Sequence, residues 1–591
     1  MRRSRPRALR VDRARTVEMR DGTVTYADVY RPASRGRSPV ILQRTPYDRS
    51  VATLALTQLD LLRAVDRGYA VVVQDCRGRH ASEGEFRPFH QERSDGYDSV
   101  EWCARQPWST GDVGMIGASY AGAVQWLAAV EAPPSLRCII PIVTSSDHYE
   151  GWTYQSGALQ WGFVVSWLYS MLASEALVNR RFQSSGGDDI KRRLIGLVDD
   201  LAGSWNTLPL RELPLVGELA PYFLDWIEHP TRDDYWRAVS VEDRHNRVQV
   251  PALNVGGWYD IFRDGTLTNF VGLRSRGASD AARAGTRLVM GPWVHSSPTS
   301  QSAGVIDFGV RSSHGWTPLH YDLDGEYLDF FDRWLQGTPT RDATTGAEGS
   351  PIRLFTMGEN RWRNEEAWPL GRAIEQRLYL HSTGVAGLSA TDGHLNANES
   401  TSEAPDSFLY DPSDPVPTLG GQLCCYAAQY APGAFDQRPV EARDDVLVFT
   451  TNALERETEV TGPIVVNLWA ATSTPDTDFT AKLVAVGPDG LALNLTDGIA
   501  RARYRRGADA ARPIAVGEPM EYVIKLGATS YLFRAGYQIR LEISSSNFPR
   551  FDRNLNTGHS LGADAVMRSA RQTVFHDAER ASYLTLPVVP R

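Results

Sequence analysis

The chain has 591 residues, of which 42% are hydrophobic and 23% charged, with a formal net charge of −9. This length exceeds one core, so we expect two to four domains. The negative charge argues against a nucleic-acid-binding surface, and no segment reaches the roughly 18 apolar residues that a membrane helix needs.

The first 145 residues alternate short apolar, β-branched runs with longer segments of helical character. Such alternation predicts a parallel sheet covered on both faces. The basic N-terminus is followed by no apolar stretch, so we expect a frayed, solvated end, no signal peptide and a cytoplasmic location. The expected strands are 23–30, 40–43, 70–75, 113–117 and 139–143, and the expected helices are 52–67, 96–106 and 120–130.

The pattern changes twice further along the chain. From Ser145 to about Arg244 helix-like runs replace strands, at 158–177 and 189–201. Strand signals return at 252–256 and 287–290, so the sheet is predicted to resume after a helical insertion. From about Pro351 short strands separated by turns predict a sandwich or jelly roll, at 352–356, 374–380, 446–450, 464–470, 479–486 and 537–543.

A serine lies at the junction of a predicted strand and helix. The run VGMIGASYAG leads from the strand through Ser119 into the helix. A turn that exposes a nucleophilic serine needs small neighbours, because larger side chains would collide with strand and helix. Gly117 and Gly122 meet this need, and Ala121 stands where a second glycine is usual. The pattern predicts a nucleophile elbow, and an ordinary tight turn is the alternative.

Two later strand ends supply a carboxylate and an imidazole. Asp260 follows the run NVGGWY, and His295 follows VMGPWV. A serine hydroxyl needs a base, and the chain order Ser, Asp, His is that of α/β-hydrolases. We expect His295 to take the proton of Ser119 and Asp260 to orient the imidazole. Asp264 is an alternative to Asp260, and a structural histidine is the alternative at position 295.

An oxyanion hole needs two hydrogen-bond donors. The first is expected to be the backbone N–H of Tyr120, directly after the nucleophile. The second usually comes from a loop after an early strand, here RTPYD (44–48), which has no glycine run. Pro46 has no N–H, so the Tyr47 hydroxyl is a substitute donor, with a packing role as the equal alternative.

The cysteines do not suggest a metal or disulfide framework. They show no CxxC and no Cys/His ligand spacing. We expect reduced thiols throughout, including two free thiols in the adjacent pair, since a bridge between neighbours would be strained. No metal-site or nucleotide-binding motif occurs, so neither metal nor cofactor is predicted. The five are Cys76, Cys103, Cys138, Cys424 and Cys425.

Taken together, these motifs resemble the bacterial cocaine esterase family, whose relatives include X-Pro dipeptidyl peptidases, cephalosporin acylases and α-amino-acid ester hydrolases. The likeness covers nearly the whole chain. It is carried by RTPYD (44–48), DCRG (75–78), SEG (82–84), GASYAG (117–122), GWYD (257–260), GPWVH (291–295), DTDFTAKL (476–483), LNLTDG (493–498) and SSSNFPRFD (544–552).

The resemblance implies an α/β fold of three domains. An α/β-hydrolase domain in two parts, 1–144 and 246–350, would carry an inserted helical cap, 145–245, and be followed by an all-β jelly-roll domain, 351–591. The triad would be Ser119, Asp260 and His295, with Tyr47 and the Tyr120 N–H as oxyanion hole. Substrate-binding positions implied by the family are Gln58, Trp152, Trp167, Phe262, Cys424 and Cys425.

Two departures from the family narrow the expected substrate. Cocaine-cleaving members carry bulky apolar residues where this chain has Cys424 and Cys425, which questions the same benzoyl pocket. Amino-acid ester hydrolases hold a substrate ammonium with extra carboxylates, whereas Arg263 follows Asp260 here and would repel a cation. With no extra N-terminal domain of the X-Pro peptidase kind, an aminopeptidase role is disfavoured.

The resulting prediction is a serine esterase or acylase that cleaves a small-molecule ester, or an amide, through an acyl-enzyme. An acyltransferase or a dedicated biosynthetic acyl hydrolase would use the same triad. A catalytically silent binding or scaffold protein is the alternative of another class. The expected partner is the substrate alone, without nucleic acid or membrane, and a homodimer is compatible with the family.

Overall fold

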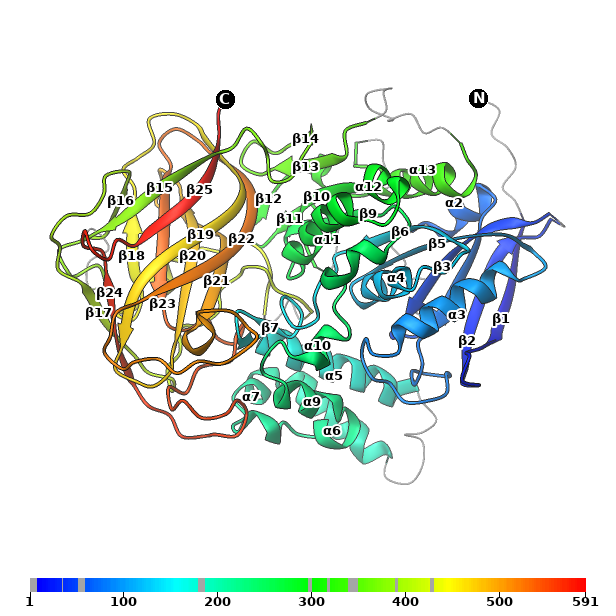
Figure 1. Cartoon of the computed structure of the whole chain (residues 1–591), viewed down its shortest axis with the longest axis horizontal. Coiled ribbons are helices and arrows are strands. Elements are labelled where there is room, and N and C mark those ends of the chain that lie inside the picture. Colours follow the sequence, from blue (N-terminus) through cyan, green and yellow to red (C-terminus); the bar gives the residue numbers. More distant parts are fainter. Residues whose placement is uncertain are drawn as a thin grey trace.

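Two β assemblies and a layer of helices make up the chain (Figure 1). The computed structural model describes residues 8–34, 36–50, 59–178, 187–295, 300–315, 319–338, 349–387, 392–425 and 430–591. The first assembly is a ten-stranded sheet in the order β1-β2-β4-β3-β5-β6-β9-β10-β13-β14. Its central strands, from β4 to β13 in that order, are parallel, and the outer strands β1, β2 and β14 pair antiparallel.

The predicted strands of this sheet are present, 70–75 and 352–356 with the predicted bounds and the others longer or shifted by a few residues. The order of elements confirms the alternation of strands and helices expected for the first 145 residues. The strands are β1 Leu9–Glu18, β2 Val24–Pro32, β3 Ser38–Thr45, β4 Ala70–Asp75, β5 Ser109–Ala118, β6 Leu136–Ile142, β9 Leu253–Tyr259, β10 Arg287–Val294, β13 Ile352–Thr356 and β14 Arg361–Glu365. The helices are α2 Leu61–Asp66, α3 Glu92–Ala104, α4 Tyr120–Val130, α11 Arg263–Arg276, α12 Asp280–Gly285 and α13 Leu323–Leu335.

Helices cover both faces of this sheet because its strands are apolar on both. In β3, Val40 and Leu42 belong to the core that contains α4, whereas Ile41 belongs to the core that contains α13. Neighbouring residues of a strand point to opposite faces, so a run of apolar residues feeds two cores. The sheet is therefore buried between layers, and only its strand ends are free to carry a site.

One strand was grouped wrongly from the sequence. The strand predicted at 352–356 exists, but β13 pairs in parallel with β10 and belongs to the first sheet, not with the C-terminal strands. The antiparallel strand β14 then closes this edge. The prediction failed because a short apolar strand looks the same in either sheet.

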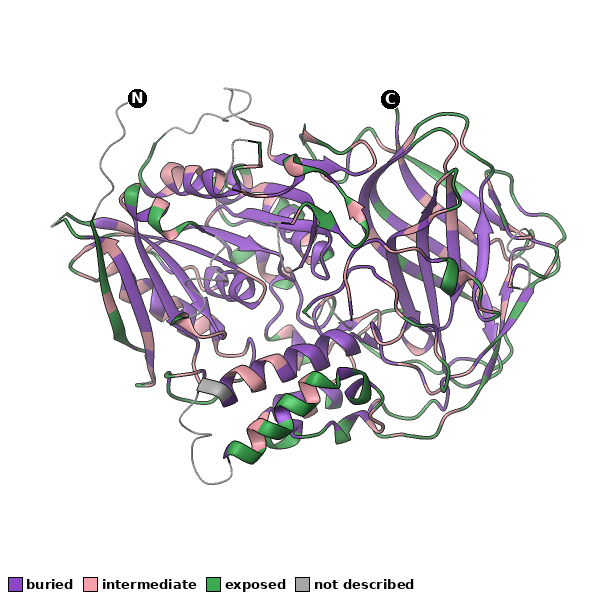
Figure 2. Cartoon of the chain, turned by 180° about the vertical axis from the view of Figure 1, so that it is seen from behind, coloured by how far each residue is buried: buried purple, intermediate pink, exposed green. Residues whose placement is uncertain are grey.

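The insertion between β6 and β9 is helical, as predicted. Helix α5 begins at Trp161, two residues after a two-stranded ribbon of β7 and β8. In Figure 2 the outward face of α6 is green, since only Gly187 and Leu194 of this helix are buried. The elements are β7 Tyr154–Gln155, β8 Ala158–Leu159, α5 Trp161–Val178, α6 Gly187–Asp199, α7 Leu201–Trp205, α8 Val216–Leu219, α9 Tyr222–Glu228 and α10 Asp234–Arg237.

The last third is all-β around a core that it shares with β9, β10 and α11, and its strands are largely buried in Figure 2. Its order is β17-β24-β19-β25-β15-β16-β18-β23-β20-β21, with β22 paired to β19. The strands are β15 Ile374–His381, β16 His394–Asn396, β17 Asp406–Tyr410, β18 Leu447–Thr450, β19 Thr458–Thr472, β20 Asp478–Val486, β21 Ala492–Arg501, β22 Met520–Phe533, β23 Gln538–Ser544, β24 Ala570–Phe575 and β25 Tyr583–Val589.

The all-β part is fastened to the end of β9. The Tyr259 hydroxyl donates to the backbone oxygen of Asn494 at 3.2 Å. The Gln422 amide donates to the backbone oxygen of Trp258 at 3.1 Å, and Leu423 forms a β-bridge with Asp260. The strand end that carries the predicted carboxylate is thus held from two sides.

Candidate active site

The turn at Ser119 has the strained backbone of a nucleophile elbow. Ser119 lies between β5 and α4 with φ 60° and ψ −123°. A Cβ on Gly117 would lie 2.7 Å from the Cβ of Ala121, and one on Gly122 would lie 2.8 Å from the Cβ of Thr144. Such distances leave no room for side chains, which explains the two glycines. The elbow exposes the serine hydroxyl at the carboxyl edge of the sheet.

Three residues distant in sequence meet at that edge. The Nε2 atom of His295 lies 3.0 Å from the Oγ of Ser119, and its Nδ1 atom lies 2.7 Å from the Oδ1 of Asp260. Asp260 is fully buried and His295 is 9% exposed. With Nδ1 protonated and bonded to the carboxylate, Nε2 is free to accept the serine proton. The arrangement has the geometry of a proton relay.

The alternative carboxylate, Asp264, lies apart from this relay. It forms an ion pair with Arg263 at 2.9 Å. The guanidinium of Arg263 also donates to the Thr496 hydroxyl at 2.9 Å and to the backbone oxygen of Leu526 at 3.0 Å. The charge of Arg263 is thus paired with Asp264 and directed at the C-terminal part, and its repulsion of a substrate ammonium stays a prediction.

The two predicted oxyanion donors are the backbone N–H of Tyr120, directly after the nucleophile, and the hydroxyl of Tyr47, on a loop that comes earlier in the chain. Tyr120 is the first residue of α4, so its backbone N–H has no partner within the helix. The phenol hydroxyl of Tyr120 has a separate partner, since it donates to Glu92 at 3.0 Å. The Tyr47 hydroxyl accepts a hydrogen bond of 3.0 Å from the indole of Trp167. Burial raises the pKa of Tyr47, against the opposing effect of hydrogen bonds with Trp167 and Ser119, so this hydroxyl keeps its proton.

One buried arginine at this site was not singled out from the sequence. Arg79 donates to the backbone oxygen of Pro46 at 3.2 Å and to that of Met171 at 3.1 Å. It also forms a buried ion pair with Glu175 of α5. Arg79 therefore joins the loop of Tyr47 to the helix of Trp167. The sequence signal that could have found Arg79 is its position directly after the DCRG motif, whereas no local sequence pattern indicates Glu175.

Aromatic rings from the helical insertion and the sheet form a wall beside the relay. Trp152 stacks on Phe262 with a centroid distance of 4.5 Å and an interplanar angle of 9°. The ring of Phe262 meets that of His295 edge to face at 5.1 Å, and Trp167 meets Trp152 edge to face at 6.1 Å. The structure thus brings these three predicted pocket residues together. Gln58, the fourth from this part of the chain, lies outside the described residues.

The adjacent cysteines, also predicted to bind substrate, have a form that was not expected. Cys424 and Cys425 are joined by a disulfide, so the prediction of two free thiols is wrong for this pair. Side chains of a regular strand alternate in direction, but Cys425 has φ 90°, which removes this alternation. The other three cysteines are free, as predicted, and they are buried. Cys424 belongs to the same core as Trp152 and Phe262.

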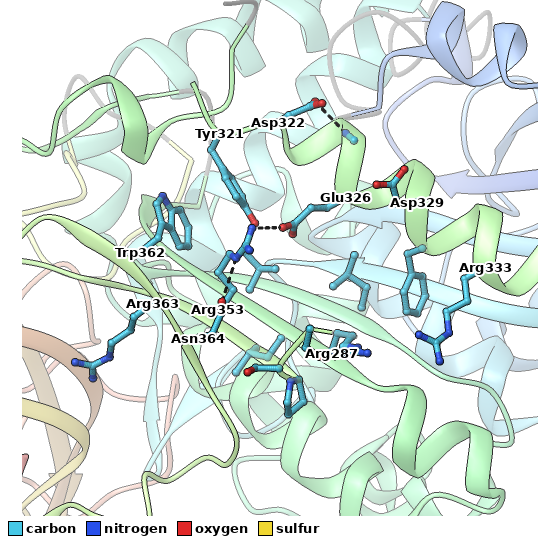
Figure 3. A pocket seen from close by; sticks show the side chains of 18 of the residues that line it. Arg287, Tyr321, Asp322, Glu326, Asp329, Arg333, Arg353, Trp362, Arg363 and Asn364 are labelled. Carbon is cyan, nitrogen blue, oxygen red and sulfur yellow. Dashed lines mark hydrogen bonds and ion pairs between the residues drawn. The ribbon is translucent and has the colours of Figure 1, made fainter. Parts of the chain in front are cut away.

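A cavity of 860 Å³ lies away from the relay (Figure 3). It opens where β9 and β10 begin, at Leu253 and Arg287. Tyr321 stands on one side of it in Figure 3 and Arg333 on the other. The relay lies beyond the opposite ends of these strands, about 20 Å along a seven-residue strand. None of the predicted site residues lines this cavity, so it is not part of the candidate active site.

Neither a metal site nor a membrane-spanning helix occurs among the residues that the structure describes. No group of three or more His, Cys, Asp or Glu side chains there is arranged to hold a metal ion. Across the same residues, the helices are all too short or too polar to cross a membrane.

Comparison with known proteins agrees with this geometry. The X-Pro dipeptidyl-peptidase (S15) family matches residues 21–297, and the C-terminal non-catalytic domain of X-Pro dipeptidyl-peptidases matches residues 346–585. The chain is 39% identical over 581 residues to the cocaine esterase of Rhodococcus sp. (strain MB1 Bresler), which covers 97% of this chain and 98% of the relative.

Solved structures share the fold over the whole chain. An aminopeptidase from a marine sediment archaeon, Thaumarchaeota archaeon, has a TM-score of 0.79 at 23% identity, covering 99% of this chain and 97% of that one. An α-amino acid ester hydrolase has a TM-score of 0.77 at 24% identity with the same coverage. These likenesses confirm the α/β-hydrolase core followed by an all-β domain.

Proposed function

The chain belongs to the cocaine esterase family of serine hydrolases, and from this premise we propose that it hydrolyses small-molecule carboxylic esters through an acyl-enzyme on Ser119. The observation that carries the proposal is the relay itself. The imidazole of His295 lies within hydrogen-bond distance of both Ser119 and Asp260, at 3.0 and 2.7 Å. These distances suit a general base that is held in one tautomer.

Acylation begins with the attack of the Ser119 oxygen on the ester carbonyl carbon. The serine proton passes to Nε2 of His295, and the resulting imidazolium is stabilised by the carboxylate of Asp260. The negative charge that develops on the carbonyl oxygen is met by the Tyr120 N–H and the Tyr47 hydroxyl. Because the phenol of Tyr47 already accepts the Trp167 N–H, its own proton is left for the oxyanion.

The second half of the reaction repeats these proton movements. His295 gives its proton to the leaving alkoxide, which departs as an alcohol and leaves the acyl group on Ser119. Water then gives a proton to His295 as it attacks the acyl carbon, and the serine recovers its hydrogen when the acid is released. Every proton is carried by the one imidazole, so no cofactor is required.

The aromatic wall supports an apolar acyl group as the preferred substrate part. Trp152, Trp167 and Phe262 all pack within the same core as Cys424. Such surfaces bind apolar groups by removing their area from water. We assign the acyl side of the pocket to these residues and to the disulfide of Cys424 and Cys425.

The experiment is turnover of p-nitrophenyl butyrate by the purified chain and by Ser119→Ala. We expect the substitution to lower kcat/KM by about 10⁴-fold or more, because the triad acts as a unit. Labelling of Ser119 with a fluorophosphonate, found by mass spectrometry of the tryptic peptide, is a second readout. Equal turnover by both proteins, or labelling at another serine, would contradict the proposal.

Hydrolysis and acyl transfer are separated by product analysis. With water as the acceptor, adding an alcohol such as methanol leaves butyrate as the main product. An acyltransferase would instead release butyrate ester in proportion to the alcohol. We propose hydrolysis, because the relatives named above are hydrolases by name.

Other expectations from the sequence stay proposals of the same kind. The domain limits of 145, 245 and 350, the jelly-roll topology of the all-β part, a cytoplasmic location and a homodimer belong to them. Because β13 and β14 lie in the first sheet, we propose residue 365 in place of 350 as the end of the hydrolase domain. Light scattering of the purified chain tests the homodimer directly.

A further inference from the structure

The disulfide of Cys424 and Cys425 directly follows a residue that pairs with the relay. The preceding residue, Leu423, forms a β-bridge with Asp260. Cys424 is 1% exposed and packs in the core of Trp152 and Phe262, while Cys425 is exposed. Cys424 is therefore buried in the same core as the residues of the proposed acyl site, and Cys425 is open to reagents.

The rest of the chain offers no competing thiol chemistry on its surface. All five cysteines lie in the described residues, and the three outside the pair are buried. Burial raises the pKa of Cys76, Cys103 and Cys138, so their thiols stay protonated and unreactive. A mild thiol reductant thus has one target in the folded protein.

We propose that Cys424 and Cys425 form a redox-controlled wall of the acyl pocket, and that reduction by a dithiol narrows the range of acyl groups the enzyme accepts. The proposal rests on the esterase function proposed above and adds a regulation to the same site. In a reducing compartment, such as the proposed cytoplasmic location, disulfides are commonly of this transient, redox-sensing kind.

The reduction is a dithiol–disulfide exchange. A thiolate of the reductant attacks the sulfur of Cys425, the S–S bond breaks, and the sulfur of Cys424 leaves and takes up a proton. The second thiol of the reductant then displaces Cys425 as a thiol and closes the reductant's own disulfide. Two electrons and two protons pass to the protein, and the dithiol is oxidised in balance.

The shape of the wall changes because the two sulfurs separate. Bonded sulfurs form one compact apolar surface, whereas two thiols must stand at van der Waals distance and can each change rotamer. Cys425 also has φ 90°, a conformation that residues with side chains seldom adopt, and the bridge no longer holds it there after reduction. The thiol of Cys424 is then free to enter the space of a bulky acyl group, while an acetyl group is too small to meet it.

The experiment compares p-nitrophenyl benzoate with p-nitrophenyl acetate before and after treatment with dithiothreitol. We expect kcat/KM for the benzoate to fall about tenfold on reduction, and that for the acetate to change by less than about twofold. Thiols are counted in the denatured protein after each treatment and removal of the reductant. The count should rise from three to five, since three cysteines are free and two are bridged.

Two variants and reoxidation serve as controls. In Cys424→Ala/Cys425→Ala the benzoate-to-acetate ratio should not respond to dithiothreitol, whereas in Cys103→Ala the response should persist. Oxidation of the reduced wild-type chain with oxidised dithiothreitol or diamide should restore the ratio, which keeps the test independent of how well the double variant folds.

The outcomes separate this proposal from the one on which it rests. A count of five thiols before reduction, or an unchanged ratio despite a rise from three to five, overturns the redox wall while leaving the esterase in place. Absence of turnover of any ester, with the rise from three to five intact, overturns the esterase function and with it the regulation.

Discussion

The indole N–H of Trp167 donates a 3.0 Å hydrogen bond to the phenol oxygen of Tyr47. Trp167 lies in α5 of the helical insertion, and Tyr47 lies on the loop after β3. Arg79 joins the same two segments through Pro46 and Met171. The insertion therefore orients one of the two proposed oxyanion donors, in addition to forming part of the pocket.

Removing the Tyr47 hydroxyl should lower kcat more than removing the indole of Trp167. Tyr47→Phe deletes a proposed oxyanion donor and is expected to lower kcat by about 10²–10³-fold with little change in KM. Trp167→Phe keeps an aromatic ring but releases the phenol, so a smaller fall in kcat is expected. Steady-state kinetics with p-nitrophenyl butyrate measure both, and an equal kcat in Tyr47→Phe and the wild-type chain would exclude the phenol from the oxyanion hole.

The two neighbouring carboxylates should behave very differently. Asp260→Asn leaves the imidazole of His295 in the wrong tautomer and should reduce kcat by about 10⁴-fold. Asp264→Asn is the matched control, because this carboxylate pairs with Arg263 instead. Its kcat should stay close to that of the wild-type chain. Comparable losses in the two variants would mean that the orienting residue has been misassigned.

Two helical glycines should respond oppositely to alanine. A Cβ at position 122 would lie 2.8 Å from Thr144, so Gly122→Ala is expected to destabilise the fold by about 1–3 kcal/mol. A Cβ at position 196, in α6, meets nothing within 4 Å, and Gly196→Ala should stabilise by about 0.5–1 kcal/mol. Midpoints of urea unfolding report both changes. A neutral Gly122→Ala would show that the elbow and Thr144 can move apart.

A buried histidine should make the all-β part less stable as the pH rises. His576 lies 3.0 Å from both Glu403 and Asp406, with Ser382 and the Phe449 ring beside it, and Glu403 also binds His381. Burial alone would lower the pKa of His576, but the bonds and charges of Asp406 and Glu403 outweigh it and raise the pKa.

Because the pKa of His576 is higher in the folded than in the unfolded state, protonation of this side chain stabilises the fold. This contribution is complete below the unfolded-state pKa of about 6.5 and is lost as the pH rises through the folded-state pKa. The stability advantage of the wild-type chain over His576→Asn should therefore shrink above pH 6.5, by at most about 1.4 kcal/mol per pH unit. Urea unfolding of both proteins at pH 6, 7 and 8 measures the difference. An advantage that grows with pH would reverse the assignment.

Residue type and position marked Ser119, Asp260 and His295 as candidates, and the family resemblance then implied the triad, which position alone had left open to alternatives. Ser119 needs small neighbours at the turn, and Asp260 and His295 each follow the end of a strand, so residue type and place coincide. Strands 70–75 and 113–117 were equally clear, being buried on both faces. The sequence predicts features for which a turn or a strand restricts the residue types at its own positions.

Features that depend on distant contacts, on exposure or on local backbone conformation were missed. β1 is mostly exposed and charged, so its pattern resembles a solvated end and gives no strand signal. The partnership of Arg79 with Glu175 joins residues 96 positions apart, and the balance of Arg263 by Asp264 depends on where α11 begins. The Cys424–Cys425 bridge depends on one backbone angle, which residue type does not reveal.

The fastening of β9 to the C-terminal part has a consequence for engineering. Trp258, Tyr259 and Asp260 are each gripped by a residue of that part, namely Gln422, Asn494 and Leu423. A shortened enzyme built from the hydrolase core alone would keep every reacting group yet lose the contacts that hold Asp260 at the end of β9. Transfer of this chemistry to a smaller scaffold therefore requires the C-terminal residues that hold β9 as well as the triad.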